Sequence, residues 1–497
     1  MKRLLFFILI FITINAASAS NADSALIEHT TLGKLTQQES LRNPALRGIG
    51  YQTSFSQLAL GIDLQRQSIA FIPEKGKGYT LPYLKVNTYH HLNDHSTEWS
   101  EASYTTGKQH DIRWNSTSDY DLLQPYILAD TLGDDTRRER YTISGGYAAK
   151  LSKWQLGAEM LVRAEQEYRS HDPRMRGIVT DLTLRIGSGC DFERYRFGAA
   201  VEGNIYKQTN SVAFYREEGV IPEYLMTGLG TEYSRFSGDK RSLYYDGGGV
   251  AIMLNAAPIN HNGVYADVLL DEHRYHRKLA EYNSMPLTDL YKEHTGVTIG
   301  WEGDNSHRLA AFAHLDYTRR TGNEHVGGTS DARYFPVIAC LTMYKSHLID
   351  TYLGTLYGKA DWNLVLTAGY KSQNEEYVYP HRQMDASHVY GKLQGQCILH
   401  PSGKLLLTVN AHASYLANVS DKLQMPFANM SDGITRLIQH KHKFATANYA
   451  DFGAKVRANY AWKQSRYGLF AEVGSALTLC SASEHQTVFQ SSIGITF

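Results

Sequence analysis

Histidine, of which this chain contains 21 residues, is the first residue type to consider for metal or haem binding. Histidines gather at His90-His91, at His273 and His276, and at His440-Lys441-His442-Lys443. Paired imidazoles can hold a transition metal or haem iron, and a strand places residues i and i+2 on one face. His440 and His442 therefore converge if this stretch is extended. A polar surface loop accounts for the same residues, and we expect neither a bound metal nor a cofactor.

Catalytic motifs are absent from the sequence. It contains no G-x-S-x-G nucleophile elbow, no H-E-x-x-H zinc motif and no phosphate-binding loop. Ser, His and Asp are so common in this chain that many combinations could be written as a catalytic triad, and no single set stands out. We therefore predict that the protein is not an enzyme and name no catalytic residue.

Charged residues recur at alternate positions within stretches that are otherwise apolar. A period of two puts them on one face of a strand and the apolar side chains on the other. They either pair across neighbouring strands and solvate an interior, which we favour, or line a selective constriction. Their mixed sign indicates neither anion nor cation selectivity. The candidate lumen-lining residues are Glu159, Arg163, Asp181, Arg185, Arg196, Glu202, Arg308, Asp316, Lys455, Arg457 and Glu472.

The elements that carry these charges are strands, and the last one is the clearest. Phe489, Ile493, Ile495 and Phe497 fall on one face, with polar residues between them. A terminal strand of this kind fits the closing strand of an outer-membrane β-barrel. After residue 19 there is no apolar run of about 18 residues, which excludes a helical membrane protein. The 34 tyrosines fit the aromatic girdles of a barrel.

The predicted connections alternate between short and long. Short ones fall near residues 152, 191, 260, 304, 359, 402 and 464, and long ones at 117–138, 208–241, 278–290, 321–345, 374–386 and 416–448. Short periplasmic turns and long extracellular loops are typical of outer-membrane barrels. Counting back from Phe497 gives about 18 strands, within a range of 16–20. The sequence thus predicts an all-β protein, a single transmembrane antiparallel β-barrel.

The N-terminus predicts export. Lys2 and Arg3 precede an apolar run, and Ala17-Ser18-Ala19 is a small-residue cleavage site, as in a Sec signal peptide. We expect residues 1–19 to be the signal peptide, 20–54 an N-terminal segment that forms a plug or a periplasmic tail, and 55–497 the barrel. Removing Lys2 and Arg3 from 50 basic residues leaves 48 against 50 acidic ones, so nucleic acid is not an expected partner.

Two short motifs resemble an uncharacterised family of outer-membrane β-barrel proteins from Bacteroidota. One is Gln124-Pro125-Tyr126-Ile127-Leu128-Ala129-Asp130, which precedes residues 141–147, and the other is His171-Asp172-Pro173-Arg174. The resemblance covers the whole mature chain. It implies a barrel in the outer membrane of a Gram-negative bacterium, beside a TonB-dependent receptor and surface lipoproteins. It implies no activity and no catalytic residues.

Each motif also has a physical interpretation. Pro125 lacks an N–H and suits an outer loop. Tyr126 could anchor this loop across the mouth of the barrel, while Asp130 accepts backbone N–H bonds. Asp172 before Pro173 favours a turn, and Arg174 could pair with a carboxylate in the lumen. Two ordered loops without a ligand remain the simpler alternative.

These observations predict a non-enzymatic outer-membrane barrel. We expect a component of a surface uptake or export assembly, working with a TonB-dependent receptor or lipoproteins. The alternative is a passive, porin-like channel for small polar solutes or peptides, because a barrel of 16–18 strands is wide enough for an aqueous channel unless something fills it.

Overall fold

The structure is a computed structural model that describes residues 22–215, 223–233, 242–280, 284–303, 308–328, 336–426, 430–462 and 467–497. The predicted signal peptide lies outside these residues. The described chain forms one 18-stranded sheet, a second sheet of three short strands, and a few short helices. Among the described residues, no helix has both the length and the apolar character needed to cross a membrane.

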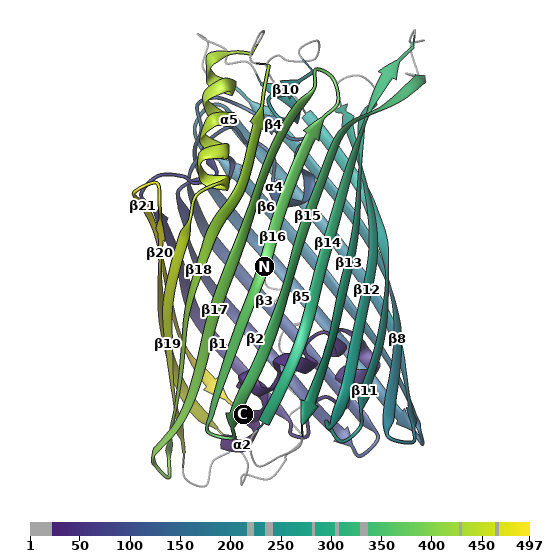
Figure 1. The fold of residues 1–497 in the computed structure, drawn as a ribbon, viewed down its shortest axis with the longest axis vertical. Coiled ribbons are helices and arrows are strands. Elements are labelled where there is room, and N and C mark those ends of the chain that lie inside the picture. Colours follow the sequence, from purple (N-terminus) through teal and green to yellow (C-terminus); the bar gives the residue numbers. More distant parts are fainter. Residues whose placement is uncertain are drawn as a thin grey trace.

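The large sheet closes into an antiparallel barrel (Figure 1). Each strand pairs with its neighbour along the chain, and the last strand pairs with the first, with Leu58 opposite Ile495 and Leu60 opposite Ile493. The predicted strand number and closing strand are therefore confirmed. The strands are β1 (Phe55–Gln67), β2 (Gly78–Asn93), β3 (Ser96–Ile112), β5 (Asp134–Leu151), β6 (Trp154–Arg169), β7 (Arg174–Phe192), β8 (Tyr195–Ala213), β11 (Ser242–Pro258), β12 (Gly263–Leu279), β13 (Met285–Gly303), β14 (Arg308–Gly327), β15 (Val337–Lys359), β16 (Trp362–Tyr377), β17 (Arg382–Ser402), β18 (Leu405–Gln424), β19 (Tyr449–Ala461), β20 (Gly468–Cys480) and β21 (Glu484–Thr496).

Alternation along each strand gives the barrel its two faces. On β6, the side chains of Trp154, Leu156 and Met160 are exposed on the outside, whereas Gln155 and Glu159 are buried inside. The same alternation recurs around the barrel because successive residues of a strand point to opposite faces. The outer surface is consequently apolar, while many polar side chains face the interior.

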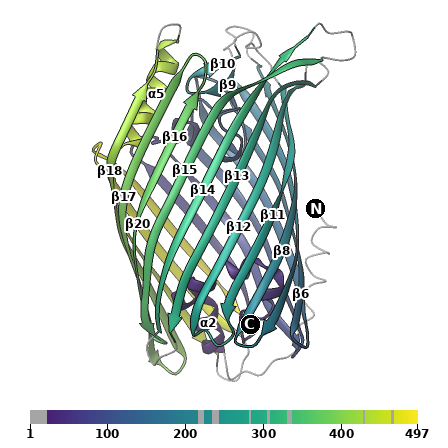
Figure 2. The same ribbon diagram turned by 45° about the vertical axis from the view of Figure 1, so that its right-hand side comes forward.

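Four short helices occupy the interior near the end of the barrel at which the chain terminates (Figures 1 and 2). They are α2 (Ala22–Thr30), η1 (Leu32–Gln37), η2 (Ser40–Arg42) and α3 (Pro44–Arg47). We call this end, which carries Phe497 and the turn at residues 152–153, the inner end. Residues 22–54, here the N-terminal segment, thus lie within the barrel.

The opposite, outer end carries the other additions. They are η3 (Pro73–Lys75), α4 (Tyr120–Leu123), α5 (Asp432–Ala445) and a sheet in the order β10-β9-β4, formed by β4 (Leu128–Ala129), β9 (Tyr224–Gly228) and β10 (Thr231–Glu232). In Figure 1, α5, β4 and β10 lie at the top of the view. Long connections therefore fold into ordered structure at this end.

Several predicted loops are shorter than expected because the strands continue into them. The predicted loop at 374–386 is a four-residue connection, since β16 ends at Tyr377 and β17 begins at Arg382. The predicted loop at 416–448 begins only after Gln424 and contains α5. Strand ends depend on pairing with a neighbour, so the hydrophobic pattern of a single segment places them poorly.

Candidate functional site

The helix α3 ties the N-terminal segment to the wall. Asn43 caps this helix by accepting a hydrogen bond from the N–H of Ala45 at 3.0 Å, and its Nδ2 donates to the carbonyl of Ser188 on β7 at 3.2 Å. Arg47 meets Glu159 of β6, with 2.6 Å between Nη1 and Oε1. Asn43 is fully buried, so the cap and the wall form one hydrogen-bonded unit.

Gln396 of β17 holds the other side of the segment. Its Oε1 accepts from the N–H of Leu32 at 2.9 Å, and its Nε2 donates to the carbonyl of Thr30 at 2.9 Å. Leu26 packs against Ile398 and Leu406. Further contacts join η1 to β14 and β16, α2 to β1, and α3 to β5, β6, β7 and β8. The anchors are thus distributed around the circumference, and residues 22–54 span the bore.

Glu28 organises the segment internally. Its carboxylate accepts hydrogen bonds from the N–H groups of Gln52 and Thr53 at 2.7 and 3.0 Å, and it pairs with Lys34 at 3.0 Å. Burial by itself raises the pKa of Glu28, but the hydrogen bonds of Thr53 and Gln52 and the charge of Lys34 outweigh it, so the pKa lies below its ordinary value. Glu28 therefore joins the two ends of the segment as an anion.

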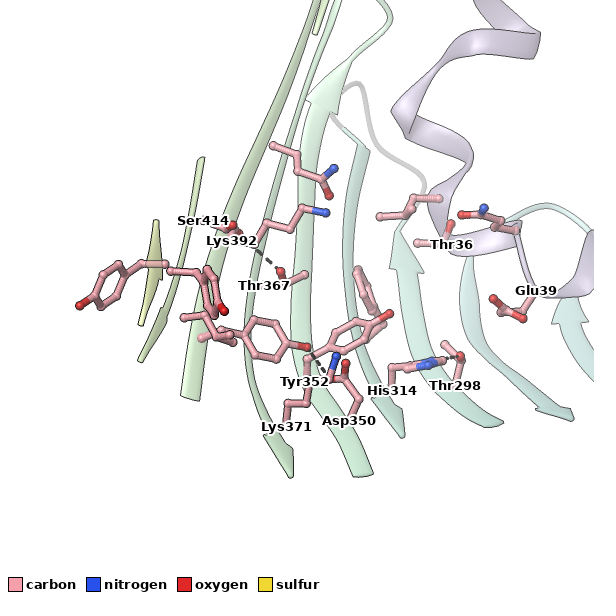
Figure 3. Close-up of a pocket in the computed structure, with 18 of the residues that line it drawn as sticks. Thr36, Glu39, Thr298, His314, Asp350, Tyr352, Thr367, Lys371, Lys392 and Ser414 are labelled. Atoms are coloured by element: carbon pink, nitrogen blue, oxygen red, sulfur yellow. Dashed lines mark hydrogen bonds between the residues drawn. The ribbon is translucent and has the colours of Figure 1, made fainter. Parts of the chain in front are cut away.

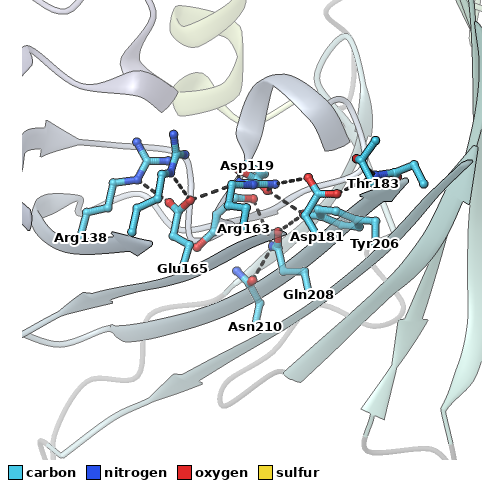
Figure 4. A network of polar contacts seen from close by, with 12 residues as sticks. Asp119, Arg138, Arg163, Glu165, Asp181, Thr183, Tyr206, Gln208 and Asn210 are labelled. Atoms are coloured by element: carbon cyan, nitrogen blue, oxygen red, sulfur yellow. Dashed lines mark hydrogen bonds and ion pairs between the residues drawn. The ribbon is translucent and has the colours of Figure 1, made fainter. Parts of the chain in front are cut away.

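At the outer end, a polar network holds residues 113–133 inside the barrel (Figure 4). Asp119, in the left-handed region with φ of 53°, accepts two hydrogen bonds from Arg163 at 2.8 and 2.7 Å and one from the Tyr206 hydroxyl at 3.0 Å. Arg163 also pairs with Asp181 at 3.1 Å. Burial raises the pKa of Asp119, but the hydrogen bonds and charge of Arg163 outweigh it and lower the pKa.

The two sequence motifs meet in this outer region. Asp130 is fully buried and accepts hydrogen bonds from the N–H groups of Leu132 and Gly133, each at 3.0 Å, as predicted. It also pairs at 2.8 Å with the guanidinium of Arg169, which follows no recognised pattern in the sequence. The guanidinium of Arg169 in turn contacts the carbonyl of Pro173 at 3.3 Å. Arg169 therefore joins the first motif to the second.

The prediction for Arg174 is wrong. Its guanidinium pairs with Asp172 of its own motif at 3.0 Å and lies 4.0 Å above the ring of Tyr215. Both partners belong to the outer loops, because Asp172 and Pro173 form the connection between β6 and β7. No carboxylate from the inner half of the barrel is within reach in the described residues.

An apolar cluster surrounds Tyr126 at the outer end. Tyr126 is buried, follows Pro125, and packs with inward-facing side chains of β7, β8, β11, β12 and β13. The ring also faces the guanidinium of Arg277 at 5.0 Å. Tyr126 thus anchors its loop across the mouth, as predicted. The other buried members include Leu128, Val179, Tyr206, Leu225, Leu243, Tyr245, Leu279, Leu287 and Leu290.

The histidine pair does not converge, because the stretch is helical rather than extended. His440 and His442 lie on α5, where residues two apart face different directions. The Nε2 of His440 donates a hydrogen bond to the carbonyl of Ala70 at 2.7 Å, and the ring of His442 lies 3.4 Å from Asp421. Among the described residues, no group of three or more His, Cys, Asp or Glu side chains is arranged to hold a metal ion.

Between these histidines, Lys441 locks α5 onto the outer loops. It pairs with Glu74 at 2.9 Å and contacts the Tyr120 hydroxyl at 3.1 Å. Burial lowers the pKa of Lys441, but the charge of Glu74 outweighs it and holds the pKa well above its ordinary value. Next to it, the rings of Phe444 and Phe71 stack at 4.8 Å. The helix therefore packs as a fixed part of the outer end.

Most predicted lumen-lining residues pair across neighbouring strands. Glu159 and Glu202 stand opposite Arg185, and Arg163 stands opposite Asp181, with ion pairs at each position. These pairs account for the charges without a selective ring. The remaining contacts are Arg196 with Asp191 at 2.6 Å, Lys455 with Glu472 at 3.4 Å, Asp316 with His294 and His314 at 2.9 Å each, and Arg457 over the Phe470 ring at 3.9 Å; Arg308 borders Gly33 of η1.

The N-terminal segment and the wall enclose a cavity of about 500 Å³ (Figure 3). Thr36 and Glu39 lie on one side, and residues of β12 to β19 form the other. A second cavity of about 290 Å³ shares Glu39, Thr298 and His314 with the first and extends to β11 and β12. Together the two fall in the size range of small-molecule sites. The first cavity is lined by aromatic rings from Tyr265, Phe312, Tyr352 and Tyr390 and by charged groups from Asp350, Lys371 and Lys392.

The fold and the site define a closed β-barrel whose bore is spanned by its own N-terminal segment. The chain belongs to the family of unknown function (DUF6850), which it matches over residues 44–497. The predicted Bacteroidota origin and the significance of the two motifs stay predictions. No curated protein matches the chain.

Three solved structures are among those that this chain is similar to. A ferric enterobactin receptor (PfeA) mutant from Pseudomonas aeruginosa is 8% identical, with 89% of this chain and 80% of that chain covered and a TM-score of 0.37. The copper transporter OprC is 10% identical, with 88% and 80% covered and a TM-score of 0.40. The siderophore receptor PirA from Acinetobacter baumannii is 8% identical, with 90% and 81% covered and a TM-score of 0.41. At these values the likenesses carry no argument about what this chain does.

Proposed function

We propose that this protein is a non-enzymatic barrel of the Gram-negative outer membrane that takes part in a surface uptake or export assembly. The observation that carries the proposal is the N-terminal segment, whose anchors reach strands around the whole bore. We infer that a barrel spanned in this way passes no solute unless the segment moves. Movement of a plug is a step that a partner protein can drive, which is the reason to place the barrel in an assembly.

The outer face supports placement in a membrane. Large apolar side chains are exposed there on every side of the barrel, among them Ile143, Ile186, Val201 and Leu353 at 58–69% of their full exposure. Soluble proteins rarely leave so large a contiguous apolar surface in water. A lipid environment removes the free-energy cost of exposing apolar surface to water. A closed barrel also satisfies its backbone hydrogen bonds within the sheet.

The partners that we propose are a TonB-dependent receptor and surface lipoproteins. Their basis is the family resemblance of the motifs at residues 124–130 and 171–174, together with the ordered outer end. The test is purification of the tagged, full-length protein from native outer membranes under mild detergent. We expect a partner in stoichiometric amount. Recovery of the barrel alone, at wild-type expression and after cross-linking, would overturn the assembly role.

The passive channel is the weaker alternative because the same segment occupies the path that a solute would take. Planar-bilayer recordings separate the two functions. A porin gives stable conductance steps from the unmodified full-length protein, whereas a plugged barrel remains silent until the segment is displaced.

A further inference from the structure

The two adjoining cavities carry charges that the barrel wall leaves unmatched. On β12, Asp267 stands between Asn255 and Thr298 in the strand register. On β17, Lys392 stands between Thr367 and Ser414. In the strand register neither has an opposite charge beside it, in contrast to the Glu159, Arg185 and Glu202 ladder. The charged side chains that the N-terminal segment adds to the smaller cavity, Arg42 and Glu39, pair with each other at 3.1 Å. The wall therefore presents an anion at one end of the combined cavity and a cation at the other.

Asp267 has capacity for a further donor. It is buried, with 6% of its surface exposed, and it accepts one hydrogen bond within the described chain, from Asn255 at 2.7 Å. A carboxylate offers about four lone-pair sites, and a buried carboxylate without a charged partner is costly. An ammonium group supplies both the charge and up to three donors.

Lys392 has the complementary need. It is half-buried in the wall of the larger cavity, and within the described residues its ammonium group forms no ion pair and no hydrogen bond. Figure 3 shows it on the wall, across the cavity from Thr36 and Glu39. Lys371, nearby, has the carboxylate of Asp350 opposite it in the register, whereas the neighbours of Lys392 in the register are uncharged. We therefore assign Lys392 to a ligand carboxylate.

The surface between the two charges suits a chain of amino acids. Tyr352 stacks on His314 at 4.8 Å, and Tyr265 and Phe312 add apolar area. The hydroxyl of Tyr390 and the ring of His314 add polar atoms. Such a lining accepts small side chains and peptide groups in turn.

We propose that the combined cavity binds a short zwitterionic peptide, with its ammonium group at Asp267 and its carboxylate at Lys392. Five strand spacings separate β12 from β17, about 24 Å along the wall. Because both side chains reach inward, the remaining gap matches an extended peptide of about six residues, roughly 20 Å long. This inference rests on the proposed function and names the class of its solute.

The test is binding of a defined peptide to the full-length protein in detergent, measured by isothermal titration calorimetry. The probes are a six-residue alanine–serine peptide, its N-acetylated form and its C-amidated form. Each modification removes one terminal charge, and we expect each to weaken binding about tenfold or more. Asp267→Asn should abolish the effect of acetylation and leave that of amidation, and Lys392→Gln should do the reverse.

Asp63→Asn is the matched control. Asp63 is an inward-facing carboxylate of β1 that also lacks an opposite charge beside it, but it lies outside both cavity linings. It should leave all three affinities unchanged. The proposal is overturned if the three probes bind equally, if none binds at millimolar concentration, if Asp63→Asn weakens binding as much as Asp267→Asn, or if an uncharged tetrasaccharide binds more tightly than the peptide.

Failure here leaves the proposed function standing if the full-length barrel is silent in bilayers and recovers a stoichiometric partner. Conductance steps from the full-length protein would remove the proposed function whatever the peptides do. The wild-type protein with the three probes already tests the inference, so it does not depend on the folding of any variant.

Discussion

Replacing Asp130 by Asn should release the outer loop at residues 113–133. Asp130 and Arg169 have fully buried side chains 2.8 Å apart, so the variant leaves a buried cation without its partner. Asn keeps an oxygen for the N–H groups of Leu132 and Gly133, and the backbone contacts of the turn are thereby preserved. Breaking a buried pair from one side costs about 3–5 kcal/mol. Local opening should therefore increase about 100- to 4,000-fold.

Hydrogen exchange of the loop peptides, followed by mass spectrometry in detergent, measures this opening. The matched control is Asp121→Asn in the same loop, whose pair with Lys75 is exposed and contributes less than about 1 kcal/mol. Adding Arg169→Gln to Asp130→Asn removes the unpaired charge and should restore part of the protection. The reasoning is refuted if Asp130→Asn exchanges like the Asp121→Asn control, or if the double variant exchanges as fast as Asp130→Asn.

Three further changes test the closures at the two ends. Because the pKa of Glu28 is lowered, its contribution to folding is complete above pH 4.5 and is lost as the pH falls through the lowered value. Hydrogen exchange within residues 22–54 should therefore rise below about pH 4.5. Glu28→Gln should remove this pH dependence. Lys441→Gln should free α5, seen as faster proteolysis within residues 432–445, whereas Lys443→Gln on the exposed face should not. Arg47→Gln should raise hydrogen exchange within residues 44–47 at least about tenfold. Arg42→Gln, which removes an exposed ion pair, should raise it less than about fivefold. Equal effects of the two variants would contradict the role of Arg47 as an anchor.

The barrel could be predicted from the sequence because the alternation of apolar and polar residues is a local feature of each strand. Alternation at Trp154, Leu156 and Met160 marks a strand and its lipid-compatible face without knowledge of any partner, and the short inner turns follow from the strand ends. The ladder of Glu159, Arg185 and Glu202 was predicted as an inward row for the same reason. The pairing of these three charges then follows from the antiparallel arrangement of neighbouring strands.

The contacts that close the barrel were not predictable, because they join residues far apart in the chain. Arg169 reaches back to Asp130, and Gln396 holds Leu32 across most of the sequence. Both lie on barrel strands with no distinguishing pattern around them. The stretch containing His440 was misread for another reason: its helix is held by packing of Phe444 on Phe71, which a local pattern does not report.

Planar-bilayer conductance of the full-length protein, compared with a chain lacking residues 22–50, tests most directly whether the N-terminal segment seals a membrane-spanning barrel. We expect silence from the full-length protein and large, stable steps from the shortened one, since the deletion leaves all 18 barrel strands intact. Steps of equal size from both chains would contradict the seal.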